Sequence, residues 1–175
     1  MFLDNRADSS ACGFWLGYSS GATVRGNTVI GSREVAIAIE HGSDNEIASN
    51  VLIGGKDGIR LFTSALSGPP SRGYRVDDNV LARLGRGLVL EGTTQLRIRG
   101  NVFDGDGEGL VADAAAKDAA VQGNVFLRPG QFFVRAPDLN AGGNYWGSTS
   151  EEATREKISG NVVLAPWQGA ERAGY

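Results

Sequence analysis

Residues 27–50 read NTVIGSREVAIAIEHGSDNEIASN, and this stretch holds one complete copy of a repeat that fills the chain. The copy begins at one asparagine and ends at the next. Seven asparagines recur in this way, at intervals of 22, 23, 29, 22, 23 and 20 residues: Asn5, Asn27, Asn50, Asn79, Asn101, Asn124 and Asn144. A repeat of about 20 to 50 residues indicates a protein that stacks one structural unit on the next. The sequence therefore predicts a solenoid.

Each repeat contains three short runs of strand-forming residues. In the quoted copy they are residues 27–30, 35–39 and 45–48, separated by glycine, serine and aspartate, which favour tight turns. Helical patterning is confined to residues 113–121 and 150–158. A repeat of 22 residues at about 3.3 Å per residue makes a loop of about 70 Å, enough for one turn around a packed interior. We therefore predict an all-β, single-stranded right-handed parallel β-helix of about six coils with a C-terminal cap.

The asparagines have a structural explanation in this fold. Equivalent asparagines in successive coils stack, so their amides can hydrogen-bond to one another and to the backbone of the turn. Glycine precedes four of them, at positions 26, 100, 123 and 143, and glycine readily adopts the left-handed backbone of a corner. We predict an asparagine ladder along the solenoid.

An apolar segment begins at the eighth residue after each of the first six asparagines. We number the residues of each segment from this position to predict which side chains face inward and which face outward. Every change in repeat length falls after this segment, which implies that the turn before it keeps one geometry. Alternation then predicts two outward rows. The first row is Trp15, Ile37, Arg60, Val89, Val111 and Val134, and the second is Gly17, Ile39, Phe62, Glu91, Asp113 and Ala136. The first row is unusually apolar for a surface exposed to water, which is typical of a protein interface.

The repeat also predicts how the chain is divided. Coils fill residues 1–147, and residues 148–175 form the C-terminal cap segment. The one long repeat carries a Gly- and Pro-rich loop insertion at residues 64–74, which we expect to overhang Arg60 and Phe62. The first repeat asparagine stands at position 5 with no capping segment before it. We therefore expect the C-terminal part of a longer β-helix protein, or a cap supplied by another subunit, with self-association through this coil as an alternative.

Composition narrows the classes of partner. A net charge of −3 and an isoelectric point near 5.2 give no basic patch, so we expect no nucleic acid. No apolar run approaches the ~18 residues of a membrane span. The first residues lack the pattern of a signal peptide. The single Cys12 and the single His41 exclude an internal disulfide and a Cys- or His-rich metal cluster.

The carboxylates offer two candidate sites. Glu91 and Asp113 fall in one outward row one coil apart, so we predict them as a catalytic acid–base pair for cleaving a glycosidic bond. Solvated surface charges are the competing reading. Asp104, Asp106 and Glu108 alternate like Ca²⁺ ligands but lack the rest of that motif, so we expect no cofactor and no metal, with Ca²⁺ as the alternative.

The remaining candidates are substrate-binding residues. Trp15, Arg60 and Phe62 share the predicted outward face with the two carboxylates, and a tryptophan there can stack on a sugar ring. Glu40 and His41 stand together at a corner, where an acid–base role competes with an ordinary turn. We predict that these five residues contact a polysaccharide.

The C-terminal sequence carries a family resemblance. Gly143-Asn-Tyr-Trp-Gly147 precedes a final Pro166-Trp167, and together with the Gly-Asn repeats these motifs resemble bacterial NosD-type periplasmic proteins and the carbohydrate-binding and sugar-hydrolase β-helix domains. The resemblance covers nearly the entire chain. It implies an exported protein, periplasmic or secreted, that binds or processes carbohydrate as a lyase or hydrolase does. The alternative is a non-catalytic structural or assembly module that uses its apolar outward row as an interface.

Overall fold

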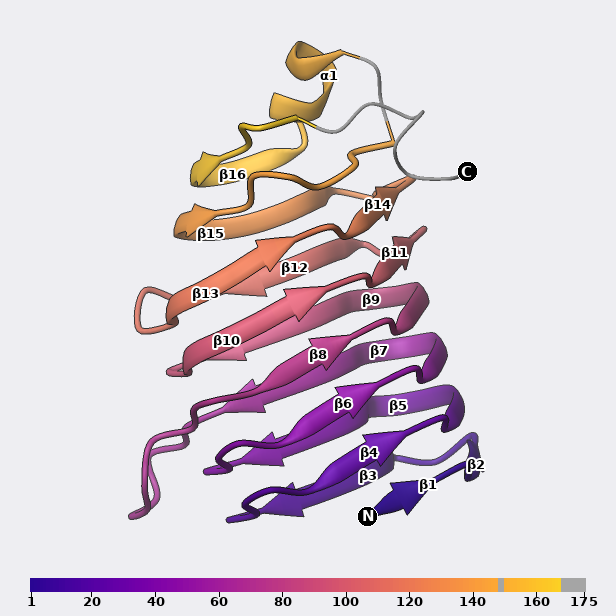
Figure 1. Cartoon of the computed structure of the whole chain (residues 1–175). Coiled ribbons are helices and arrows are strands. Elements are labelled where there is room, and N and C mark those ends of the chain that lie inside the picture. Colours follow the sequence, from indigo (N-terminus) through magenta and orange to yellow (C-terminus); the bar gives the residue numbers. More distant parts are fainter. Residues whose placement is uncertain (148–149, 168–175) are drawn as a thin grey trace.

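The chain winds into a right-handed solenoid of about seven turns in a computed structural model that describes residues 1–147 and 150–167 (Figure 1). All strand pairs are parallel, and they join equivalent strands of successive coils. The fold is therefore the predicted parallel β-helix, with slightly more turns than the six expected.

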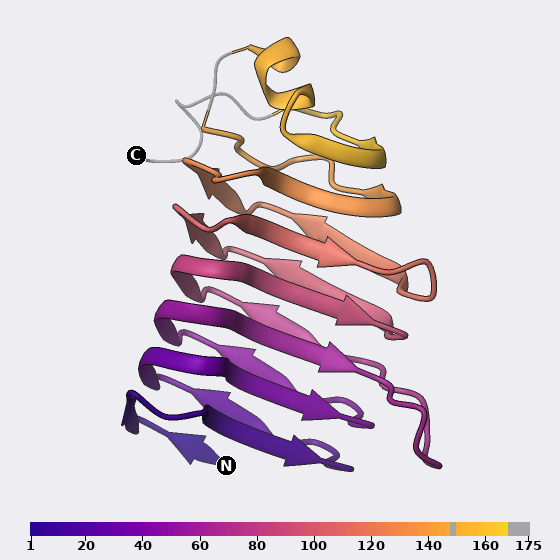
Figure 2. The same cartoon turned by 180° about the vertical axis from the view of Figure 1, so that it is seen from behind.

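Two sheets form the walls of the solenoid. The six-stranded sheet contains β1 (Phe2–Leu3), β4 (Thr23–Arg25), β6 (Glu46–Ala48), β8 (Arg75–Asp77), β10 (Thr94–Arg99) and β13 (Lys117–Gln122). The main path of the ten-stranded sheet contains β2 (Arg6–Asp8), β5 (Thr28–Glu40), β7 (Val51–Phe62), β9 (Val80–Glu91), β12 (Glu108–Ala112), β15 (Phe132–Asn140) and β16 (Ile158–Val163). Beside that path lie β3 (Cys12–Gly17), β11 (Val102–Asp104) and β14 (Val125–Leu127). Seen from behind, the long strands β5, β7 and β9 stack on one another (Figure 2).

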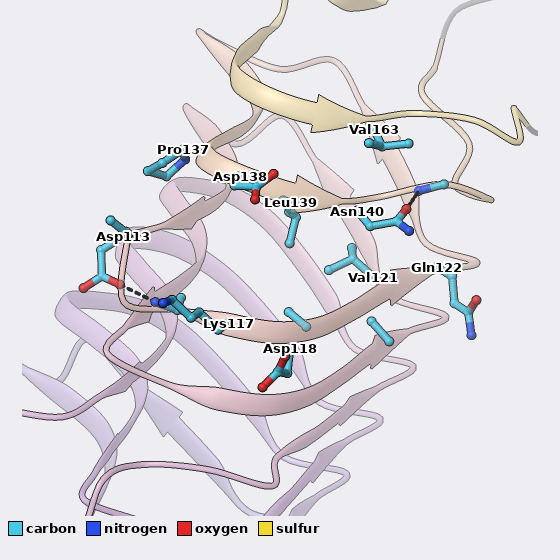
Figure 3. Close-up of a pocket in the computed structure, with 15 residues that line it drawn as sticks. Asp113, Lys117, Asp118, Val121, Gln122, Pro137, Asp138, Leu139, Asn140 and Val163 are labelled. Atoms are coloured by element: carbon cyan, nitrogen blue, oxygen red, sulfur yellow. Dashed lines mark hydrogen bonds between the residues drawn. The ribbon is translucent and has the colours of Figure 1, made fainter.

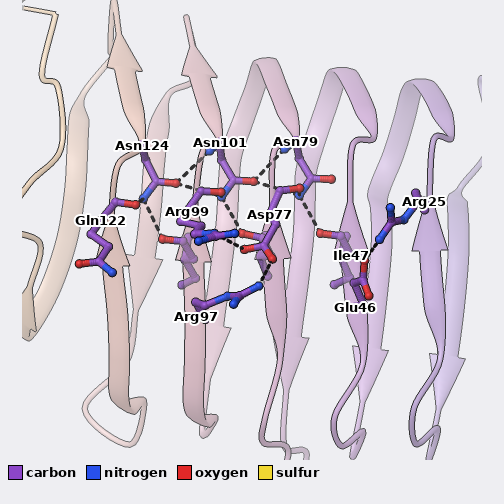
Figure 4. Close-up of polar contacts among 12 residues, drawn as sticks. Arg25, Glu46, Ile47, Asp77, Asn79, Arg97, Arg99, Asn101, Gln122 and Asn124 are labelled. Carbon is purple, nitrogen blue, oxygen red and sulfur yellow. Dashed lines mark hydrogen bonds and ion pairs between the residues drawn. The ribbon is translucent and has the colours of Figure 1, made fainter. Parts of the chain in front are cut away.

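The seven asparagines stack along one corner. Each side-chain amide donates to the side-chain oxygen of the next asparagine, at 2.9 Å for the Asn79–Asn101 and Asn101–Asn124 pairs (Figure 4). The same oxygen of Asn101 also accepts the backbone N–H of Asn79 at 3.0 Å. From Asn27 onward the asparagines are at most 1% exposed. Because buried polar groups are costly unless they are hydrogen-bonded, this row ties every coil to the next.

The residue before each asparagine has a left-handed backbone. φ is +68° at Gly26 and +67° at Gly100, but also +54° at Ser49 and +56° at Asp78. A second reason favours glycine at position 100, because a β-carbon there would lie 2.1 Å from the Asp78 carboxylate. The corner thus selects glycine both for its backbone and for close contact between coils.

Part of the predicted sorting into inward and outward positions is wrong. Ile37, Ile39 and Val134 are 0% exposed and belong to the core, whereas they were expected to face outward. The register explains this, because Val35 pairs with Cys12 on one side and with Asp57 on the other. Val35 stands eight residues after its asparagine and the other two stand seven after theirs, so the first turn of that coil has one extra residue. One extra residue moves every following side chain to the opposite face.

Aromatic residues fill the last coils. Trp146 is 0% exposed and stacks on Phe126 with ring centroids 4.7 Å apart, and Phe126 stacks on Phe103 at 4.6 Å. Beyond Trp146 the short helix α1 (Glu151–Arg155) and β16 follow, in the region where the sequence predicts helical patterning. Ile158 and Trp167 pack against this end of the core, which shields it from water.

Candidate functional site

The outer surface of the ten-stranded sheet brings four of the predicted residues into one cluster: Trp15, Arg60, Phe62 and Glu91. The register places them there, because Phe62 pairs with Glu91 on β9 and with Glu40 on β5. Trp15 is 53% exposed, and its ring meets the edge of Phe62 at a centroid distance of 6.0 Å and an angle of 82°. We call these four residues the Trp15 cluster.

Charge and ring contacts hold the Trp15 cluster together. The Arg60 guanidinium carbon lies 4.6 Å from the centre of the Phe62 ring, in a cation–π contact. Arg60 also donates to the Glu91 carboxylate, with Nε at 2.8 Å. Phe62 itself is only 7% exposed. Trp15 therefore projects from a support whose side chains are already fixed by their neighbours.

A row of alternating charges runs beside this cluster. Asp57, Arg86 and Glu108 pair across successive coils, and Arg135 binds Glu108 from the coil beyond. Arg86 donates to Asp57 from Nε at 2.7 Å and from Nη2 at 2.6 Å. This hydrogen bond raises the pKa of Arg86, and the Arg135 hydrogen bond lowers the pKa of Glu108. The charges in this row are thus compensated within the protein.

The two predicted catalytic carboxylates have separate partners. Glu91 accepts from Arg60, as described above. The Asp113 carboxylate accepts backbone N–H groups from Gly92, Ala115 and Ala116, at 2.8 to 3.1 Å. Asp113 therefore fixes the turn that follows β12, and no hydrogen bond joins it to Glu91 among the described residues. Their catalytic role stays a prediction.

His41 lies at the corner beyond β5 and is only 2% exposed. Its Nδ1 is 2.8 Å from the Pro69 carbonyl and its Nε2 is 3.1 Å from the Ser64 hydroxyl. Tyr18, which the sequence did not single out, stacks on His41 at 5.0 Å and donates to the Ser67 carbonyl. The loop insertion therefore contacts Tyr18 and His41 at the corner, and its Ser71 hydroxyl donates to the Phe62 carbonyl at 2.6 Å. The neighbouring Glu40 pairs with Phe62 through the backbone register.

The three carboxylates considered as an alternative Ca²⁺ site have different surroundings. Arg128 donates from Nε to the Asp104 carboxylate at 2.7 Å, and Arg135 donates to the Glu108 carboxylate. Asp106 is 2% exposed. Within residues 1–147 and 150–167, no three histidine, cysteine, aspartate or glutamate side chains gather where they could hold a metal ion.

Repeating parallel coils, a buried asparagine row and an outward aromatic cluster define the class as parallel β-helix repeat proteins. Within that class, a family model described as "Periplasmic copper-binding protein (NosD)" matches residues 1–165, so the chain belongs to the NosD family. This confirms the resemblance in the sequence and supports an exported, extracytoplasmic β-helix protein. Searches of curated proteins and of solved structures found no match. In the part of the chain that the structure describes, no helix is long and apolar enough to cross a membrane.

The residues present do not fit the copper of the family description. Protein copper sites use histidine, cysteine and methionine, and this chain has one of each. Both ring nitrogens of His41 have partners within the protein. The Cys12 sulfur lies 3.8 Å from the Glu34 carboxylate, and Met1 is 86% exposed at the chain's first position. The three potential ligands are not brought together, so we derive no chemistry through copper.

Proposed function

We propose that this chain is a carbohydrate-binding β-helix domain of an exported protein, and that the Trp15 cluster is its sugar platform. The observation that carries the proposal is the half-exposed Trp15, held against Phe62 beside an ion pair. The apolar C–H face of a sugar ring packs well on such an indole, and the hydroxyls find donors and acceptors in adjacent charged side chains. A platform whose side chains are already fixed loses little conformational entropy on binding.

The charge balance points to an uncharged polysaccharide. Three ion pairs lie on this face: Arg60 with Glu91, Arg86 with Asp57 and Arg135 with Glu108. A uronate polymer would have to break one of these pairs to gain an arginine partner. A neutral polymer can hydrogen-bond to the outer edges of the pairs without separating them. The parallel strands extend this face over several coils, which suits a chain of sugars better than a single one.

We propose binding as the primary activity, and cleavage by Glu91 and Asp113 remains a further prediction. Each carboxylate already accepts hydrogen bonds from the protein, and these bonds favour its charged form, so both groups are better suited to accept a proton than to donate one.

The alternative function, an apolar interface, is weakened by the observed register. Ala38 takes the outward position that was expected for Ile37, and Arg135 takes that of Val134. Val89 and Val111 are 1% and 7% exposed, so neighbouring side chains already cover them. Self-association through the first coil, where Phe2 and Leu3 are 40% and 44% exposed, remains a separate prediction.

A thermal-shift screen tests the proposal. The chain is heated with neutral glucans, xylans, mannans and uronate polymers, with and without Ca²⁺, while light scattering follows its oligomeric state. We expect a neutral glycan to stabilise the chain saturably, Trp15→Ala to abolish the shift and Trp15→Phe to keep part of it. Glu91→Gln should weaken it, and Asp104→Asn, in an ion pair outside the Trp15 cluster, should not. No shift with any glycan, together with a stable dimer, would overturn the proposal in favour of an interaction module.

A further inference from the structure

A groove of about 910 Å³ opens between β13 and the second half of β15 (Figure 3). It exists because the six-stranded sheet ends at β13. In the next coil, residues 138–140 pair with β16 and are not paired with β13. Beyond the groove the two coils meet at the corner, where the Gly123 N–H donates to the Gly143 carbonyl at 2.8 Å. The groove is thus bounded by the edges of two strands that diverge from this corner.

Backbone groups on the β13 side point into the groove. The Val121 carbonyl accepts the Asn144 side-chain amide at 2.8 Å, so the backbone of residue 121 faces the following coil. Alternate residues of a strand direct their backbone groups to the same side, so Ala119 also faces this way. Among the described residues, β13 pairs with β10 alone, so no strand pairs with the side that Ala119 faces.

The β15 side has the same property. The Ala141 N–H donates to the Val163 carbonyl on β16, at 2.8 Å. By the same alternation, the backbone groups of Asp138 and Asn140 face away from β16 and toward the groove. The groove therefore offers main-chain donors and acceptors from both of its walls.

The side chains divide the groove into an apolar floor and a polar rim. Val121 and Leu139 lie between the two strands and are 2% and 7% exposed (Figure 3). The rim carries more acidic than basic groups, with three carboxylates and one ammonium: Asp113, Asp118, Asp138 and Lys117. No aromatic side chain lines the groove among the described residues, which disfavours a sugar ligand and separates this groove from the Trp15 cluster.

We propose that this groove binds an extended, basic polypeptide segment as an added β-strand. Main-chain hydrogen bonds to Ala119 and to residues 138 and 140 would supply affinity, as in other strand-addition complexes. Alternate side chains of the segment would rest on Val121 and Leu139, and its basic side chains would reach Asp118 and Asp138. An acidic rim repels nucleic acid and acidic peptides, so the charge selects a basic partner.

Fluorescence anisotropy with three labelled heptapeptides tests the proposal on the full chain. The first peptide is Lys-Thr-Val-Thr-Lys-Val-Thr. The second has the same sequence with N-methyl groups on alternate residues, which removes main-chain donors and keeps every side chain. The third replaces lysine by glutamate. We expect saturable binding of the first peptide and losses of about tenfold or more for the other two.

Two charge variants complete the test. Asp118→Lys with Asp138→Lys reverses the rim and should weaken the first peptide by about tenfold, because opposite charges become like charges. Asp8→Lys with Glu152→Lys makes the same change in net charge at exposed positions outside the groove and should leave binding within about twofold. Equal binding of the N-methylated peptide, equal losses in both double variants, or no saturable binding of the first peptide would overturn the proposal. Sugar binding at Trp15 is independent of each result.

Discussion

Asp106 is the residue whose environment most favours a proton. It is 2% exposed, its Oδ1 accepts the Leu84 N–H at 2.9 Å, and its Oδ2 has no partner among the described residues. Burial raises the pKa of Asp106 to about 7. The folded chain therefore binds this proton more tightly than the unfolded chain, in which the carboxyl group has its ordinary pKa of 3.8.

This shift predicts a pH dependence of stability. Between pH 3.8 and about 7 the folded state holds a proton that the unfolded state has lost, so the free energy of unfolding falls as pH rises, by up to about 1.4 kcal/mol per pH unit. The contribution is complete below this window and lost above it. Asp106→Asn should remove the dependence and stabilise the chain at pH 8. Urea denaturation at pH 5 and pH 8 checks this, and a variant with an unchanged pH slope would contradict it.

The asparagine row makes a second prediction for single residues. Asn79 accepts from the backbone and side chain of Asn50 and donates to Asn101 and to the Ile47 and Asp77 carbonyls. Asn79→Ala leaves several of these buried groups unpaired and should lower the free energy of unfolding by about 3 kcal/mol or more. Asn161→Ala, at an exposed asparagine, should change it by less than about 0.5 kcal/mol. Similar losses in the two variants, measured by chemical denaturation, would show that the row is not a main source of stability.

At the scale of elements, His41 makes two of the contacts that hold the loop insertion. A carbonyl only accepts hydrogen bonds, so His41 donates through Nδ1 to Pro69, and Ser64 can donate to Nε2 of the neutral ring. His41→Ala removes both contacts and the stacking with Tyr18. We expect amide hydrogen exchange in residues 64–73 to accelerate by about tenfold or more while the coils keep their protection. Leu66→Ala, at an exposed position of the same loop, is the control. Unchanged exchange in the His41 variant would place the anchor of the loop elsewhere.

The order of the strands follows from the repeat in the sequence. In two coils, however, the repeat does not predict which side chains face inward and which face outward. Counting from the asparagines finds the strands, the left-handed corners and the Trp15 cluster. Each of these features lies at a fixed number of residues from the repeat asparagine of its coil. The count fails at Val35 and Phe132, where the first turn contains one more residue than in the neighbouring coils. A bulge keeps the strands paired but reverses which side chains face inward and which face outward. A single sequence does not show where such an extra residue has been inserted.

Some contacts at the candidate sites could not be predicted from the sequence. Tyr18 and His41 meet a loop that lies 23 to 49 residues away along the chain. The sequence places Glu91 and Asp113 in one outward row but does not fix the direction of their side chains. The two carboxylates could therefore face each other or accept hydrogen bonds from different donors. The open edge of β13 appears only when the following segment joins β16. Each of these features comes from three-dimensional packing and has no local pattern.

For the whole molecule, the donor set predicts that this member of the NosD family does not retain copper. Among the described residues, its single histidine and single cysteine have partners within the protein, and no contact joins either of them to Met1. Chain incubated with Cu(I) and then with a competing chelator should hold well below one equivalent of metal, measured by mass spectrometry of the metal. Retention of one equivalent that His41→Ala abolishes would contradict the prediction.

We propose above all that this exported β-helix binds a neutral polysaccharide through Trp15. Isothermal titration of the stabilising glycan into the wild type and into Trp15→Ala tests it most directly. We predict saturable binding by the wild type and a loss of about tenfold or more in the variant, because the exposed indole supplies the stacking surface. Equal affinity of the two proteins, or tighter binding of a uronate polymer than of any neutral glycan, would contradict the claim.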